Sequence, residues 1–163
     1  SEKVREFLKK LKMEEKYLVA NAVKAWLLEK LYQCSGNEFL DKIVAAGKIM
    51  YLMDAIMPKV APEIKMSYSN EELNWAKLNE NNVWQQLIEQ DALYSKDDRL
   101  EVNWISDGPF TKGLPSDSPS RMGIWMGWQM VKDFMNANPE VSLGELVIEP
   151  NSKRILKYYD PKE

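Results

Sequence analysis

The sequence predicts an all-α protein, a single compact domain of five or six helices around a buried central helix at about 118–136. Three observations support this fold class. The central stretch is apolar on nearly every side, as is typical of a buried helix. Other stretches repeat apolar residues at the i, i+3, i+4, i+7 spacing of amphipathic helices, and two helices open with a capping-box pattern. The 163 residues suit one domain, 1–163, whose core needs no disulfide.

The central helix has its own start signal and two glycines in its interior. Ser118 is a good N-cap residue, and Pro119 suits the first helical position because its missing N–H would have no partner there. Gly123 and Gly127 share one side of the helix because they lie one turn apart. Each glycine costs ~1 kcal/mol relative to alanine inside a helix. We therefore expect another helix or a ligand to approach closely on this side.

The first part of the chain predicts three further helices. Residues 2–12 form an amphipathic helix, residues 14–33 form a second, and residues 38–57 form a third that ends before a proline. A loop with two prolines follows at 58–68. The side chains expected to lie on the apolar side of the first two helices are Val4, Phe7, Leu8, Leu11, Val19, Val23, Trp26, Leu27 and Leu31.

A fourth helix begins after Ser69, which forms a capping box with Glu72, and runs to about Gln90. Residues 91–119 are rich in turn-forming residues and predict a long loop, with a short strand at 100–105.

The chain ends with two short helical segments after the central helix. A second capping box, formed by Ser142 and Glu145, opens a short helix at 142–149. Residues 151–158 predict one last helical turn or two.

Composition excludes several functional classes. The net charge is −3, the pI is near 5.2 and no basic block is present, which argues against nucleic-acid binding and against adhesion to an anionic membrane surface. The chain has no histidine and one cysteine, Cys34, which rules out an internal disulfide and the H-E-x-x-H zinc motif. We expect no metal site and no cofactor.

Seven residues are candidates for a ligand site or a structural polar cluster. Glu80 falls on the buried side of the fourth helix, and a buried carboxylate needs a partner. We expect that partner to be Arg121, whose planar guanidinium can bind a carboxylate through two hydrogen bonds. The pair fits a structural role or a ligand-binding role. The full set is Lys48, Tyr51, Asp54, Glu80, Trp84, Arg121 and Trp125, together with the close-packing glycines Gly47, Gly123 and Gly127.

Several of these residues leave two roles open. Asp54 lies near the buried side of the third helix and also needs a partner. Lys48 has either an apolar stem with a solvated ammonium or an amine with a lowered pKa. Trp84, Trp125 and Trp128 suit either the core or a platform on which a sugar stacks.

Six stretches, in this order and spacing, resemble the gliding-motility lipoprotein B (GldB) family. The resemblance runs from Met13 to Pro161 and is most specific in the helix with Glu80 and in the central helix. The stretches are MEEKYLVANAVKAWL (13–27), GKIMYLMDAIMP (47–58), YSNEELNWAKLNENNVWQQLIEQDALYS (68–95), GPFT (108–111), SPSRMGIWMGWQMVKDFM (118–135) and VSLGELV (141–147). The family-like residues are Gly47, Lys48, Tyr51, Glu80, Trp84, Arg121, Gly123, Gly127 and Trp128.

The resemblance implies a bacterial cell-envelope lipoprotein on the periplasmic face, related to gliding motility or to the linked secretion machinery. It implies that this chain is the C-terminal portion of a longer protein, and that membrane association depends on a lipid anchor which these residues lack. It also implies a zincin-like helical arrangement. A peptidase would carry its metal motif near Asn21–Ala25, which holds no histidine, and Ala46-Gly47 stands in place of a Glu-Gly pair.

These observations favour a non-catalytic, pseudo-peptidase-like scaffold that binds an envelope protein. The alternative is a small-ligand or glycan-binding domain with a tryptophan-lined cleft near Glu80, Arg121 and Trp125. The third hypothesis is an enzyme that works without histidine and uses Glu80 or Asp54 as its base.

Overall fold

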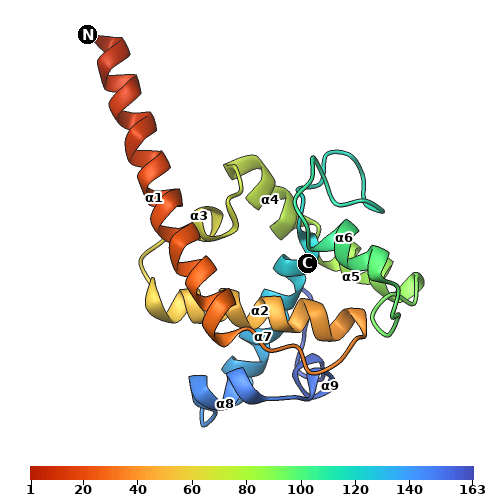
Figure 1. Ribbon diagram of the computed structural model, residues 1–163. Helices are drawn as coiled ribbons and strands as arrows, with labels where there is room; N and C mark the ends of the chain where they lie inside the picture. Colours follow the sequence, from red (N-terminus) through yellow and green to blue (C-terminus); the bar gives the residue numbers. More distant parts are fainter.

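Two helices, α2 (Phe39–Ile56) and α7 (Met122–Ala137), pack against each other at the centre of the computed structural model (Figure 1). Most α7 side chains are buried, among them Trp128 and Phe134. The predicted buried central helix is therefore confirmed. Several of the other helices pack against this pair, and one hydrophobic core extends through them.

The structure describes the backbone of residues 1–163 and the side chains of residues 1–7 and 14–163. Over this backbone the regular structure is helical, which confirms the all-α class. It contains nine helices, more than the five or six expected, because two short helices occupy predicted loop segments and one predicted helix is divided in two. The others are α1 (Glu2–Leu31), α3 (Pro62–Met66), α4 (Asn70–Leu78), α5 (Glu80–Glu89), α6 (Asp98–Trp104), α8 (Leu143–Ile148) and α9 (Ser152–Leu156).

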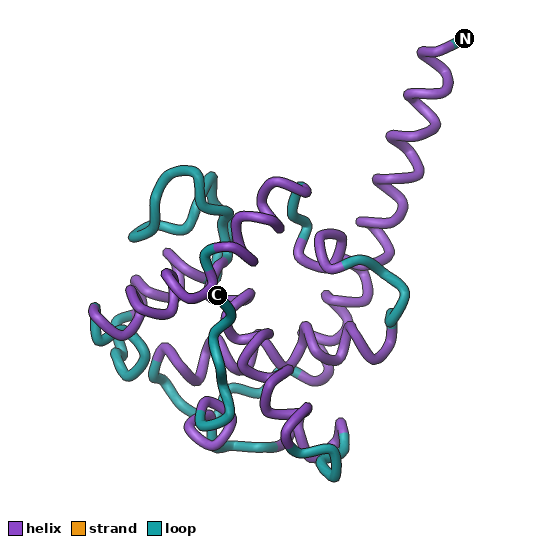
Figure 2. Tube along the Cα trace, turned by 180° about the vertical axis from the view of Figure 1, so that it is seen from behind, coloured by secondary structure: helices purple, strands orange, loops and turns teal.

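Helix α1 replaces the two helices predicted at 2–12 and 14–33. No glycine or proline interrupts these residues, so the helix continues through them. Its first part extends away from the other helices, as seen from both sides in Figures 1 and 2. Val4 and Phe7 are more than half exposed there. The prediction for Leu8 and Leu11 falls outside the side chains that the structure describes.

The second half of α1 packs on α2 and α3 through a narrower surface than the sequence indicates. Ala20 and Leu27 are buried, whereas Val19 and Trp26 are about half exposed. The prediction that all of these apolar residues face the core was therefore wrong for Val19 and Trp26.

The predicted fourth helix is divided into α4 and α5 at Asn79. Asn79 has φ −111° and ψ 9°, and its side-chain amide donates to the Trp75 carbonyl oxygen at 2.9 Å. This bond competes with the regular helical ladder and marks the break. The capping box of Ser69 and Glu72 at the start of α4 is confirmed.

Three other predictions for short segments have mixed outcomes. The strand predicted at 100–105 was wrong, because Asp97 caps helix α6 by accepting from the Arg99 N–H at 3.0 Å. Part of the predicted loop 58–68 forms α3, with Pro62 at its first position. The capping box that opens α8 and the final turn at α9 are confirmed.

Helix α7 begins at Met122, later than the predicted start at Ser118. The backbone N–H of Met122 donates to Thr111 Oγ1 at 3.1 Å, and the same hydroxyl donates to the Pro119 carbonyl oxygen at 2.7 Å. A threonine from the preceding loop thus takes the role of the cap. The N-cap position itself is Arg121, in the left-handed region with φ 61° and ψ 31°.

None of the helices whose residues the structure describes is both long enough and apolar enough to cross a membrane.

Candidate functional site

A cleft of about 840 Å³ opens between α1, α2, α6 and the start of α7. It combines polar and apolar lining, and three cations, Lys24, Lys42 and Arg121, contribute to it. The exposed Asp107, on the loop after α6, lies at the same cleft. Charged groups from several elements thus converge on this open hollow.

Arg121 is held at the cleft by contacts from three directions. Its side chain is 14% exposed, and its Nε forms an ion pair with Asp107 Oδ1 at 3.1 Å. Its guanidinium carbon lies 5.3 Å from the centre of the Tyr68 ring, and Nη2 donates to the Ser67 carbonyl oxygen at 3.4 Å. Tyr68 is itself fixed, because its hydroxyl donates to the Ser120 carbonyl oxygen at 2.6 Å. The guanidinium is therefore positioned before any ligand arrives.

The backbone of Arg121 is strained. A side chain with a Cβ rarely adopts positive φ, and such a residue costs of order 1–3 kcal/mol that the surrounding structure must offset. Residues in this state are common at binding sites and ligand clamps. The strain places the arginine side chain between Tyr68 and Asp107 at the entrance to α7.

The strain predicts an unusual ranking of two Arg121 variants. Both Arg121→Gly and Arg121→Ala lose the guanidinium contacts, but glycine adopts the left-handed conformation without a steric penalty. We expect Arg121→Gly to be more stable than Arg121→Ala by roughly 1 kcal/mol, measured by urea unfolding. At Lys132, inside helix α7, the same comparison should reverse, with alanine the more stable by about 1 kcal/mol. If alanine were the more stable residue at position 121 as well, the backbone of Arg121 would not be strained.

Lys24 is the second cation of the cleft. Its Nζ donates to the Lys65 carbonyl oxygen at 2.6 Å. Burial and the positive charge of Arg121 lower its pKa to about 8, and Asp107 partly opposes this shift. A neighbouring negative charge would therefore favour the charged form of Lys24.

This pKa predicts a pH dependence of stability. Between pH 8 and about 10.5 the unfolded chain keeps the Lys24 proton while the folded chain loses it, so the free energy of unfolding rises with pH. We expect wild-type protein to gain stability relative to Lys24→Met across this range. Urea unfolding at a series of pH values measures the difference. A constant difference would contradict the lowered pKa.

Glu80 does not pair with Arg121, so that prediction was wrong. Glu80 is only 3% exposed. Its carboxylate accepts hydrogen bonds from the Tyr159 hydroxyl at 2.9 Å and from the Lys162 backbone N–H at 3.4 Å. Burial raises the pKa of Glu80. Trp84 packs edge-on against the Tyr159 ring, with centroids 5.1 Å apart. Glu80 and Trp84 thus hold the C-terminal segment against α5.

Asp54 belongs to a partly buried polar cluster away from the cleft. One carboxylate oxygen accepts from Lys65 Nζ at 2.7 Å and the other from Trp128 Nε1 at 2.8 Å. The Lys65 side chain is only 4% exposed. The predicted need of Asp54 for a partner is therefore met by residues of α3 and α7, which join α2 through this carboxylate.

The other candidates lie in or beside the core. Lys48 is buried, its Nζ donates to the Glu149 carbonyl oxygen at 2.6 Å, and burial lowers its pKa. Tyr51 is half-buried against the core. Trp125 is buried and meets Trp128 edge-on at 5.7 Å between ring centroids.

Glu80, Arg121 and Trp125 therefore contact different neighbours. The structure does not join them into the tryptophan-lined cleft expected in the alternative hypothesis. It also adds residues to the Arg121 site that sequence reasoning missed, namely Lys24, Tyr68 and Asp107. No local sequence pattern connects these three residues, which meet only when the chain folds.

The central glycines lie where α2 and α7 cross. A Cβ on Gly127 would collide with the Ile43 carbonyl oxygen, and a Cβ on Gly47 would collide with the Gly127 carbonyl group. A Cβ on Gly123 would lie 2.8 Å from the Trp104 carbonyl oxygen. These glycines allow the backbones to touch, which fixes the position of α7 and hence of Arg121 at its start.

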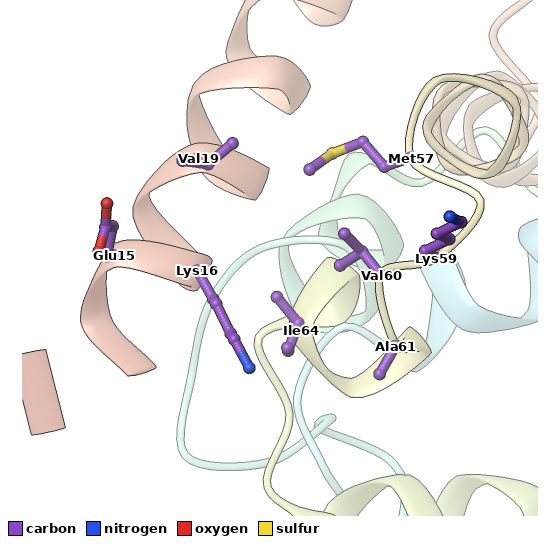
Figure 3. A pocket seen from close by; sticks show the side chains of 8 residues that line it. All are labelled: Glu15, Lys16, Val19, Met57, Lys59, Val60, Ala61 and Ile64. Carbon is purple, nitrogen blue, oxygen red and sulfur yellow. The ribbon is translucent and has the colours of Figure 1, made fainter. Parts of the chain in front are cut away.

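A second hollow, of about 550 Å³, lies between α1 and the segment 57–64 (Figure 3). Val19 on one side faces Met57, Val60 and Ile64 on the other, with charged groups at the rim. Its lining is mainly apolar, and Glu15, Lys16 and Lys59 are its charged residues.

Among the side chains of residues 1–7 and 14–163, no group of three or more histidine, cysteine, aspartate or glutamate residues could hold a metal ion.

The fold and the cleft define a small helical domain with a nearly buried arginine presented at an open hollow of mixed polarity. The family model described as gliding motility protein GldB matches residues 1–161, so the chain belongs to the GldB family. Membership identifies it as a gliding-motility-related envelope lipoprotein. Comparisons with curated proteins and with solved structures gave no match.

Proposed function

We propose that this chain is a non-catalytic binding module of the cell envelope, and that the cleft around Arg121 receives a protein partner. The observation that supports this proposal is the strained, nearly buried Arg121, which the fold holds at an open hollow. Buried arginines at interfaces are frequent determinants of binding energy. The domain acts on the periplasmic face of the envelope.

The strained backbone and the desolvated guanidinium of Arg121 lower the stability of the fold, and packing of the core requires neither of them. A purely structural role would be served by a glycine at this backbone position and by a more exposed ion pair. The fold instead directs the guanidinium to a hollow of about 840 Å³, a size that accepts a protruding side chain or short segment of another protein.

The test is affinity capture from detergent-solubilised envelope. Wild-type domain is compared with Arg121→Gln and with Arg99→Gln as the matched control, because Arg99 is 86% exposed and pairs with Asp97 outside the cleft. Circular dichroism and urea unfolding first establish that all three proteins are folded. We expect a discrete protein retained by wild type and by Arg99→Gln, and lost with Arg121→Gln.

Two results would contradict the proposal. Equal retention by Arg121→Gln would place the binding surface elsewhere or show that the arginine is dispensable. Peptidase activity that a chelator abolishes would show that the domain is catalytic.

A further inference from the structure

The lining of the Arg121 cleft includes three cations, Lys24, Lys42 and Arg121, and two acids, Glu101 and Asp107. Lys42 is neutralised by Asp98 at 3.0 Å and Glu101 at 2.8 Å. The remaining cations, Lys24 and Arg121, face one acid, Asp107.

Asp107 is a weak internal partner. Its side chain is 93% exposed, so water competes for both of its oxygens, and exposed ion pairs contribute little. The loop that carries it follows the end of α6 at Trp104, and the neighbouring Ser106 and Gly108 are also exposed. An incoming acid could therefore replace Asp107 without disturbing the core.

The guanidinium suits a carboxylate in particular. Its described contacts engage Nε and Nη2, while the planar group offers five N–H donors in a fixed fork. Two parallel N–H donors match the two oxygens of a carboxylate. The Tyr68 ring holds one face of the guanidinium, so its orientation is set before binding.

We infer that the cleft recognises a carboxylate group of the partner protein through Arg121 and Lys24, and that Asp107 occupies this position in the free domain. The inference rests on the proposed function and names the chemistry of its site. The carboxylate comes from an acidic side chain or from a chain terminus. Binding releases Asp107 from Arg121 and brings the carboxylate of the partner near Lys24.

The experiment is an NMR titration of the folded domain with three short peptides of otherwise identical sequence. One carries glutamate with both ends capped, one carries glutamine with both ends capped, and one carries glutamine with a free carboxyl terminus. We expect the first or the third to shift the amide signals of Ser106 and Ile124, which line the cleft. The capped glutamine peptide should not shift them. The peptide that binds distinguishes a side chain from a terminus as the source.

Two variants test the roles of the residues. Asp107→Asn should tighten binding of the carboxylate peptide roughly two- to fivefold, the range that corresponds to an exposed ion pair. Asp117→Asn, which changes an exposed acid outside the cleft lining, should leave the affinity unchanged. No tightening in Asp107→Asn, or equal binding of all three peptides, would overturn the inference.

The pH dependence gives an independent readout. Affinity should fall as the pH rises above about 8, because Lys24 then loses its charge, and Lys24→Met should remove this dependence. The titratable or charged groups that share the cleft with Lys24 are Tyr32, Lys42, Glu101, Asp107 and Arg121. The pKa of Tyr32 is raised to about 12, and hydrogen bonds to Glu101 and Asp98 raise the pKa of Lys42, so neither group gives the same loss of charge above pH 8.

Failure of this inference can be told apart from failure of the proposed function. Partner capture that depends on Arg121 without any preference for carboxylate peptides would overturn only the inference. Carboxylate binding in the cleft together with Arg121-independent capture would overturn the proposed function.

Discussion

Gly127→Ala is expected to destabilise the domain by about 3 kcal/mol or more, because a single methyl group would strike backbone rather than a movable side chain. The added Cβ would collide with the Ile43 carbonyl group on α2, and Gly47 lies across the same crossing. Helices α2 and α7 would have to separate along the centre of the core. The favourable effect of alanine on the helix, ~1 kcal/mol, is smaller than this cost.

Urea unfolding monitored by circular dichroism measures the change. Gly144→Ala is the matched control, because Gly144 also lies in a helix and its added Cβ would come no closer than 3.9 Å to the Ser142 hydroxyl. We expect that variant to be neutral or up to ~1 kcal/mol more stable. Similar stabilities for Gly127→Ala and wild type would mean that α2 and α7 are not in backbone contact.

Asp54→Ala is expected to cost about 3–5 kcal/mol, the second largest effect. The substitution leaves the Lys65 ammonium, with a side chain 4% exposed, without its ion-pair partner at 2.7 Å. It also removes the acceptor of Trp128 Nε1. Because the Asp54 side chain is 27% exposed and water can reach it, we expect a cost of about 3 kcal/mol, at the lower end of this range.

A double variant distinguishes the cost of leaving Lys65 unpaired from the cost of losing the Asp54 side chain. Asp54→Ala combined with Lys65→Met should recover part of the stability, since no unpaired charge then remains in the core. Asp98→Ala is the control for an exposed pair, because the Asp98 side chain is 92% exposed, and it should change the free energy of unfolding by less than about 1 kcal/mol. A double variant that is less stable than Asp54→Ala would contradict the proposed buried pair.

Elements with strong local signals were predictable from the sequence. The capping boxes at Ser69 and Ser142 begin α4 and α8, because both partners of a capping box lie within one turn. The burial of α7 followed from side chains that leave almost no polar surface on the helix.

Elements set by contacts across the fold were not predictable in this way. The start of α7 depends on Thr111, a residue of the preceding loop, whereas the local sequence predicts a start at Ser118. The partner of Glu80 is Tyr159, far along the chain. No spacing rule connects residues so distant, so the choice of Arg121 rested on chemical suitability alone.

The candidate site shows the same division. Arg121 stood out in the sequence as a cation at the start of an apolar helix, but the positive φ that directs it into the cleft has no local signature. Lys24 lay within an ordinary helix, and Asp107 lay within a loop. Their convergence depends on how α1, α6 and α7 pack.

Site-specific photocrosslinking in intact envelope tests most directly the central claim that the Arg121 cleft is the binding surface. A photoreactive amino acid is placed at the exposed Ser106 in the cleft, and in a second protein at the exposed Lys157 just after α9. We expect a discrete protein adduct from position 106 that Arg121→Gln abolishes, and none from position 157. Adducts from position 157 alone, or an adduct at 106 that persists in Arg121→Gln, would contradict the claim.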